Sequence, residues 1–336
     1  MRAYLQFMTV DFSADRRTGR VLAVARTLGA GTIGTEHLLA GLAGVDSGAR
    51  AVLDDVDLTR PVVEFLLSGR GGRWTGPDGV EVVDMRVAVA GSALTPGANT
   101  ALARFMQRPA PARTPENLLV ALLDDEKAHA AAMLRACGAE VARVRRAARG
   151  GQLVRPADRV APELRAARDV LIGRSRYRGN GLRDRAVAVL ARNRAGRAVT
   201  PVPARARTRI DYAAAPVLWA RAEADAIAGR RGGRARTDDL LVGLLAAYQV
   251  AEAYPHLVHG RVEQYDGVRD LVESGLDYRS AATGSATLAL GEDAVPPSRL
   301  LRPGADWPRD TAELLRRLMQ HQDNRSARLI QAFVRV

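Results

Sequence analysis

Acidic residues recur at the start of four apolar helical patterns in this chain of 336 residues. The phrase reads GTEHLLAGL at residues 34–42, TPENLLVAL at 114–122, TDDLLVGL at 237–244 and, more weakly, TAELL at 311–315. A phrase that returns at such intervals indicates an internally repeated helical protein. A carboxylate in the first turn favours a helix by about 0.3–1 kcal/mol, and a threonine hydroxyl can satisfy a free amide. This structural use explains the recurring acids as well as a binding use does.

The elements that would position these acids are two four-helix repeats, at about residues 12–68 and 94–150. Apolar residues in both stretches recur at helical spacing, and proline stands at early helical positions. Gly69 to Gly79 form a glycine-rich connection between the repeats. We expect helix caps or starts at Ser13, Thr35, Ser47, Thr59, Thr95 and Thr114.

The basic charge is concentrated in one segment. The chain has 50 basic and 37 acidic residues, a net charge of +13. Residues 141–210 hold 19 Arg and 4 acidic residues, a net of +15, so the remainder carries −2. Lys127 is the only lysine, which is consistent with a codon bias and weakens the inference that each arginine was selected for binding. We expect short helices at 161–172 and 182–194 and a linker around Pro201 and Pro203.

Composition excludes several classes of protein. Cys137 is the only cysteine, so no intrachain disulfide forms and a cytoplasmic location is expected. The sequence has neither a secretory leader pattern nor an apolar run that could span a membrane. His256 and His259 are spaced as a His-x-x-His pair, but no supporting ligands accompany them, so we expect no metal site. We expect no cofactor and no enzymatic activity, because no phosphate-binding Gly-Lys loop and no nucleophile elbow is present.

The phrases at 34–42 and 114–122 resemble the Clp repeat of the amino-terminal domain of ClpC-like AAA+ unfoldases. Leu94-Thr95-Pro96 and residues 134–140 fit the same pattern, and the resemblance covers residues 12–150. It implies an all-α fold of tandem four-helix Clp repeats that form two pseudo-twofold domains. These would be a Clp-type domain at 1–150, an Arg-rich linker at 151–210 and a diverged second domain at 211–336.

The resemblance also implies a site. In such domains one glutamate in each repeat accepts the guanidinium of a phosphorylated arginine on a client protein. The matching residues are Glu36 and Glu116, and a carboxylate suits this role because it grips guanidinium by charge-assisted hydrogen bonds. Pro115, and Asn99 where a basic residue is usual, depart from the pattern and predict a weaker second site. The implied ligand-binding set is Glu36, Glu116, Thr35, Ser13, Thr95 and Thr114.

Two functions from different classes follow. The first is a non-enzymatic protein that binds clients, adaptors, Clp system components or peptide-like small molecules, as an accessory or decoy for a Clp protease system. The alternative is a nucleic-acid-binding regulator that uses the Arg-rich residues 141–210 to neutralise phosphates. An acidic protein partner is also compatible with that segment. A hydrolase whose site is not visible in the sequence is the least favoured alternative. Neither main function needs a membrane.

Overall fold

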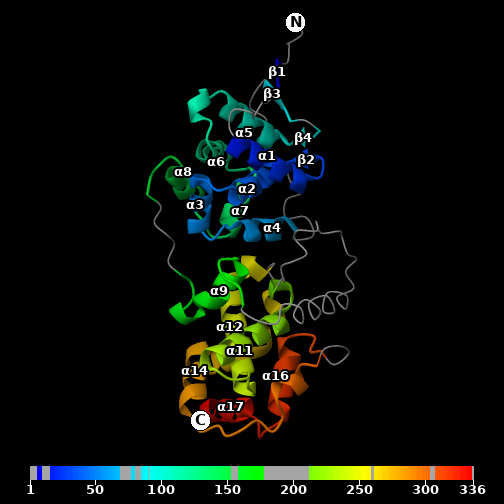
Figure 1. The fold of residues 1–336 in the computed structure, drawn as a ribbon, viewed down its shortest axis with the longest axis vertical. Coiled ribbons are helices and arrows are strands. Elements are labelled where there is room, and N and C mark those ends of the chain that lie inside the picture. The colour runs from blue at the N-terminus through cyan, green and yellow to red at the C-terminus, as the bar shows by residue number, and fades with distance from the viewer. Residues whose placement is uncertain are drawn as a thin grey trace. The chain divides into compact units, whose positions relative to one another are not determined.

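The computed structural model describes residues 6–9, 16–68, 77–79, 85–89, 91–152, 158–177, 212–258, 261–302 and 307–334. In this part of the chain nearly all regular structure is helical, which confirms the predicted all-α class (Figure 1). None of the described helices is both long and apolar enough to cross a bilayer. The chain forms two compact units, an N-terminal unit of Met1–Ala157 and a C-terminal unit of Asp158–Val336.

The helices of the N-terminal unit lie where the two repeats were predicted. Thr95 caps α5 by accepting the N–H of Ala98, and Thr114 caps α6 by accepting the N–H of Asn117. Ser47 caps α3 in the same way. The helices are α1 (Arg16–Gly29), α2 (Thr35–Gly44), α3 (Gly48–Asp55), α4 (Arg60–Ser68), α5 (Pro96–Met106), α6 (Pro115–Leu122), α7 (His129–Ala136) and α8 (Val141–Ala148).

Two short parallel strand pairs bring distant helix starts together. β1 (Gln6–Thr9) pairs with β3 (Met85–Ala88), and β2 (Thr32–Ile33) pairs with β4 (Ala93–Leu94). The N–H of Thr95 continues the second pairing by donating to the carbonyl of Ile33 at 3.0 Å. Because β2 leads into α2 and β4 leads into α5, the parallel register places the first residues of both helices at one edge.

The C-terminal unit is built around two long central helices. Trp219 of α11 is fully buried and meets the ring of Tyr265 edge-on, with 5.8 Å between the ring centres. A 3₁₀ turn at Tyr212–Ala214 precedes α11. The helices are α9 (Arg165–Leu171), α11 (Pro216–Arg231), α12 (Thr237–Ala253), α13 (Arg269–Glu273), α14 (Tyr278–Thr287), α15 (Pro297–Leu300), α16 (Thr311–Gln320) and α17 (Arg325–Val334).

Residues 158–177 belong to the C-terminal unit, whereas the sequence placed them in a linker. The N–H of Arg159 donates to the hydroxyl of Tyr254 at 3.0 Å, and the Arg168 guanidinium lies 5.9 Å from the centre of that ring. Tyr177 is anchored as well, because the Trp219 indole donates to its hydroxyl at 2.8 Å. The predicted helix at 161–172 appears as a 3₁₀ turn followed by α9, and the one predicted at 182–194 lies outside the described residues.

The same close helix crossing occurs in both units. A Cβ atom added at Gly41 of α2 would collide with the carbonyl oxygen of Val21 in α1. A Cβ atom added at Gly243 of α12 would collide in the same way with the carbonyl oxygen of Ala220 in α11. Both glycines stand six residues after the threonine of the recurring phrase, so these two copies of the phrase mark a helix pair that lacks room for a side chain.

Candidate functional site

Asp78 joins three helix starts of the N-terminal unit. Its Oδ1 accepts the Thr35 hydroxyl at 2.5 Å and the His129 N–H at 2.9 Å. Its Oδ2 accepts the Thr35 N–H at 2.7 Å and the Thr95 hydroxyl at 2.5 Å. Burial alone would raise the pKa of Asp78, but these hydrogen bonds lower it below its ordinary value. Asp78 is 3% exposed, and nothing in the recurring phrase pointed to it.

Thr35 does not cap α2, contrary to the sequence prediction. Gly34 is the N-cap residue, and Thr35 is the first residue of the helix. The Thr35 hydroxyl donates to Asp78 and accepts the N–H of Ala130 at 3.0 Å. The threonine of the phrase therefore ties the start of α2 to the start of α7, because its hydroxyl lies between an aspartate and a backbone amide.

Glu36 points from the start of α2 toward the start of α7. Its Oε2 lies 3.1 Å from Nδ1 of His129, and its side chain is 9% exposed. The side chain curls back over Gly34, where an added Cβ atom would collide with both carboxylate oxygens. Glycine at this position therefore leaves the space that Glu36 needs.

The neighbouring His37 does not neutralise Glu36. Its Nδ1 accepts the N–H of Gly34 at 3.0 Å and lies 3.3 Å from Oε1 of Glu36. Burial lowers the pKa of His37, more than the nearby carboxylates raise it, so the ring is kept neutral. A nitrogen that accepts a hydrogen bond has no proton to donate. Among the described residues, Oε1 of Glu36 therefore receives no hydrogen bond.

Glu116 is placed in the second repeat as Glu36 is in the first, and it contacts a helix of the other repeat. It stands at the start of α6, and its Oε1 accepts the N–H of Ala49 at the start of α3, 3.2 Å away. Burial opposes ionisation, but hydrogen bonds from the Thr114 hydroxyl and from backbone amides lower the pKa of Glu116. Glu36 meets α7 and Glu116 meets α3, so each predicted glutamate contacts the third helix of the other repeat. Glu116 is the more exposed of the two.

The structure groups the remaining predicted residues differently from the sequence. Thr95 was expected beside Glu116, but its hydroxyl lies on Asp78, which also holds Thr35. Asn99 is buried and accepts the N–H of Val87 at 2.8 Å, so it links β3 to α5. Thr114 stays with Glu116. Ser13 lies outside the described residues.

The C-terminal unit repeats this arrangement with other residues. Asp293 accepts both the N–H and the hydroxyl of Thr237, as Asp78 does for Thr35. It also accepts the N–H of Arg325 at 3.0 Å, and the N–H of Ser326 donates to the Thr237 hydroxyl at 3.1 Å. The first two residues of α17 thus make the same contacts as the first two residues of α7. Asp238, which follows Thr237, corresponds to Glu36.

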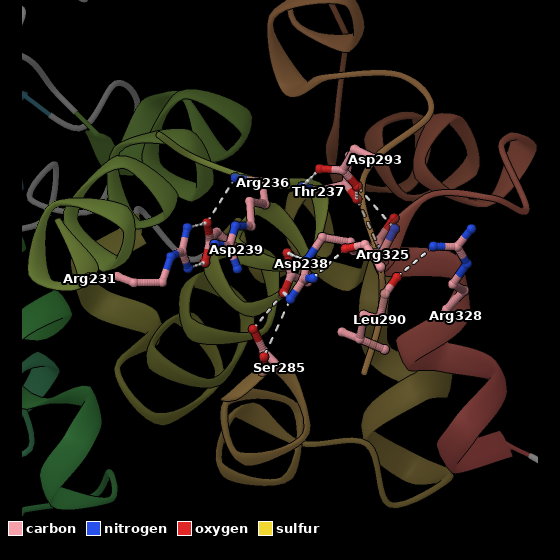
Figure 2. A network of polar contacts seen from close by, with 12 residues as sticks. Arg231, Arg236, Thr237, Asp238, Asp239, Ser285, Leu290, Asp293, Arg325 and Arg328 are labelled. Atoms are coloured by element: carbon pink, nitrogen blue, oxygen red, sulfur yellow. Dashed lines mark hydrogen bonds and ion pairs between the residues drawn. The ribbon is translucent and has the colours of Figure 1, made fainter. Parts of the chain in front are cut away.

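Asp238 holds the guanidinium of Arg325 by two parallel hydrogen bonds (Figure 2). Nε lies 2.9 Å from Oδ1, and the NH2 group lies 2.9 Å from Oδ2. The Ser285 hydroxyl also donates to Oδ2, at 2.6 Å. Burial opposes ionisation of Asp238, but the bonds from Arg325 and Ser285 lower its pKa. In the carboxylate that corresponds to Glu36, both oxygens therefore accept hydrogen bonds, and the partner is an arginine.

The other acids of the phrases at 237–244 and 311–315 accept backbone N–H groups at helix starts. Asp239 accepts the N–H of Arg236 at 2.8 Å and pairs with the Arg231 guanidinium, as Figure 2 shows. In α16 the N-cap is Asp310, not Thr311, so the phrase at 311–315 is shifted by one residue from that of α6. Glu313 stands where α6 has Asn117, and it accepts the N–H of Arg309. Ala312 stands where α6 has Glu116, so this carboxylate is missing from the C-terminal unit.

Glu36, Asp78 and His129 have ligand atoms within 4.8 Å of one another, close enough to consider a metal ion. Both oxygens of Asp78 already accept two hydrogen bonds each. That leaves at most Glu36 and His129 as ligands, and structural metal sites in proteins use more ligands than two. The cluster fits a hydrogen-bond network better than a metal site. His256 is buried against the ring of Tyr254.

The described part of the Arg-rich segment is largely paired with acids. Arg143 pairs with Glu140, Arg145 and Arg149 with Asp124, and Arg165 and Arg168 with Asp158. Tyr177, the one aromatic residue of the segment, is also unavailable for stacking on bases, since its hydroxyl donates to the buried Glu223. Residues 178–211 lie outside the described part of the chain.

Comparisons with known protein families, curated proteins and solved structures find no match to this chain.

Proposed function

We propose that this protein is a non-enzymatic binding protein whose N-terminal unit receives arginine side chains of client proteins, phosphorylated arginine included. Glu36 is the principal receptor of the guanidinium, and Glu116 is a second and weaker one. The resemblance of residues 12–150 to the Clp repeat supports a role as an accessory or decoy for a Clp protease system.

One observation carries the proposal. At the position of Glu36, the C-terminal unit has Asp238, and this carboxylate binds a guanidinium in the bidentate geometry that makes such pairs strong. The N-terminal unit keeps the surrounding contacts but has His129 where the other unit has Arg325. Glu36 consequently has an oxygen to which no described residue donates a hydrogen bond. A ligand arginine would supply the missing guanidinium.

His129 controls access to Glu36 in this proposal. Its ring lies against the carboxylate, and the residue is 8% exposed. Its backbone N–H, in contrast, donates to Asp78 and does not depend on the side chain. The imidazole can therefore turn away without breaking the bond between α7 and Asp78, and an entering guanidinium would replace it.

The guanidinium carries more of the affinity than the phosphoryl group in this account. The hydroxyls of Thr35 and Thr95 already donate to Asp78, so they have no further proton for a phosphoryl oxygen. Backbone amides at the starts of α2 and α7 are also occupied, because the N–H groups of Thr35 and His129 donate to Asp78. We therefore expect methylguanidinium, which lacks a phosphoryl group, to compete with phosphoarginine for the site.

Isothermal titration calorimetry of the full chain with free phosphoarginine tests the proposal. The matched variants are Glu36→Gln and Glu116→Gln, which keep the side-chain shape and remove the charge. A charge-assisted hydrogen bond contributes about 1.5–3 kcal/mol, or roughly ten- to a hundredfold in affinity. We expect a loss of this size for Glu36→Gln, a smaller loss for Glu116→Gln, and displacement of phosphoarginine by methylguanidinium. Undetectable binding to the wild type, or equal binding by all three proteins, would refute the proposal.

A further inference from the structure

We propose that the C-terminal unit contains a guanidinium-binding site that the chain fills with its own Arg325. Removal of this side chain would leave a site that a free guanidinium ion can occupy. The inference concerns the surroundings of Asp238 alone, so it does not depend on what the N-terminal unit binds.

The contacts of the Arg325 head group define the site. Besides its two bonds to Asp238, the guanidinium donates from NH1 to the carbonyl of Gly291 at 2.6 Å and from NH2 to the carbonyl of Ser285 at 3.5 Å. Every partner is an acceptor, and together the acceptors contact all three nitrogens of the guanidinium, Nε, NH1 and NH2. Such an arrangement recognises a planar cation with several N–H donors, and an ammonium ion cannot satisfy it equally well.

The site is held in shape by contacts that do not involve the Arg325 side chain. Asp238 accepts the Ser285 hydroxyl, and it follows Thr237, which is fixed by Asp293. The backbone of Arg325 is fixed separately, because its N–H donates to Asp293. Figure 2 shows Asp238 and Ser285 beside the Arg325 guanidinium and Asp293 beside Thr237. Truncation of the side chain therefore removes the cation and leaves its acceptors in place.

The burial of Asp238 determines how much stability the Arg325→Ala variant loses. Asp238 is fully buried, and a buried carboxylate without its partner is strongly unfavourable. Arg325→Ala should lower the Tm of the C-terminal unit by about 10 °C. Guanidinium or ethylguanidinium ions should restore part of this loss, since a ligand that binds the folded state stabilises it by mass action. At ten times its Kd the ion should raise the Tm by about 4 °C.

The test is thermal unfolding of the full-length Arg325→Ala chain, followed by the fluorescence of Trp219 and Trp307 in the C-terminal unit. Ethylguanidinium chloride is compared with ethylammonium chloride at equal ionic strength. Arg328→Ala is the matched control, because Arg328 donates from NH1 to the carbonyls of Leu290 and Glu292 and the carboxylate that it pairs with, Asp323, is exposed. The double variant Asp238→Asn/Arg325→Ala lacks the carboxylate and should not respond.

Selective stabilisation of Arg325→Ala by ethylguanidinium is the expected result. The proposal would be overturned if the two ions raised the Tm of Arg325→Ala equally, or if neither ion raised it. A rise in the Tm of Arg328→Ala or of the double variant with ethylguanidinium would also overturn it. If Arg325→Ala does not fold without the ion, Arg325→His replaces it. That variant copies the residue found at the equivalent position of the N-terminal unit, His129, and it should fold and respond to ethylguanidinium in the same selective way.

Discussion

His129 and Arg325 occupy equivalent positions in the two units. Each is the first residue of its helix, and each donates its backbone N–H to an aspartate that also holds a threonine, at 2.9 Å and 3.0 Å respectively. Each side chain then contacts the carboxylate that follows that threonine, Glu36 or Asp238. The two units therefore share one polar framework and differ in the cation that it holds.

Substitution of Gly34 by alanine should separate the ligand role of Glu36 from its role in folding. Gly34 has φ −101° and ψ 175°, an extended conformation that alanine adopts freely. The new Cβ atom would collide with the Glu36 carboxylate, which lies at the end of a flexible side chain and can move away. We expect the free energy of unfolding to change by less than about 1 kcal/mol, while phosphoarginine affinity falls about tenfold.

Urea unfolding and calorimetry on Gly34→Ala check both quantities. Gly31→Ala is not a suitable control, because Gly31 has a φ of 109° that strains alanine. Gly229→Ala is suitable, since a Cβ atom there meets nothing within 4 Å. Unchanged ligand affinity in Gly34→Ala would show that the position of Glu36 does not matter for binding.

Asp78→Asn should destabilise the protein at neutral pH by about 3 kcal/mol, because a neutral amide cannot accept all four hydrogen bonds. The folded pKa of Asp78 is lowered from the ordinary value of 3.8. Its stabilisation is therefore present above that value and is lost as the pH falls through the folded pKa. Chemical unfolding at several pH values measures this. The difference in the free energy of unfolding between wild type and Asp78→Asn should narrow below about pH 4. A difference that stays constant with pH would contradict the lowered pKa of Asp78.

Glu223→Gln should have the opposite effect. Burial raises the pKa of Glu223 above 4.5, although the Tyr177 hydroxyl that donates to it partly opposes the shift. The free energy of unfolding therefore falls as the pH rises from 4.5, the pKa in the unfolded chain, through the higher pKa in the folded protein. We expect Glu223→Gln to be more stable by about 1 kcal/mol at pH 7, with a flatter pH profile.

Thermal unfolding between pH 4 and pH 8 checks the prediction. Glu252→Gln is the matched control, because Glu252 also accepts a tyrosine hydroxyl, from Tyr248 at 3.2 Å, but is exposed. The same rise in Tm in both variants would mean that the burial of Glu223 does not cause the stabilisation.

Removal of residues 179–210 should leave both units folded. Tyr177 and Tyr212 meet edge-on with 5.1 Å between their ring centres, so a short Gly-Ser linker of about four residues can join them. This deletion removes eight of the 19 arginines in residues 141–210 and spares the paired ones. We expect unchanged phosphoarginine affinity and loss of any affinity for RNA at low salt. RNA binding that survives with a steep salt dependence would locate the basic contacts elsewhere.

The sequence predicts the helical framework well because local signals determine it. Thr95-Pro96 and Thr114-Pro115 cap and open helices, and the structure confirms both starts. The copies of the phrase at 34–42 and 237–244 include a close helix crossing at Gly41 and Gly243, which explains why these two copies have a glycine there. The predicted linker was too long because Arg159 and Tyr177 make tertiary contacts that no local pattern reveals.

The site was less predictable, since its central residues are distant in sequence. Asp78 lies 43 residues from Thr35 and 51 from His129, and it stands in a stretch read as a glycine-rich connection. The preference of threonine for N-cap positions predicts a cap at Thr35, but a buried aspartate competes for its hydroxyl. At 311–315 the N-cap is Asp310, and the Thr311 hydroxyl donates to the carbonyl of Gln264.

The most direct measurement is calorimetric titration of phosphoarginine into the full-length His129→Arg and His129→Ala variants beside the wild type. Arginine at position 129 should fill Glu36 as Arg325 fills Asp238, whereas alanine should remove the competing imidazole. The account predicts loss of binding by at least about tenfold in His129→Arg, with a raised Tm, and tighter binding than wild type in His129→Ala. Wild-type affinity in His129→Arg, with the variant folded, would contradict the claim that Glu36 receives the guanidinium of a ligand.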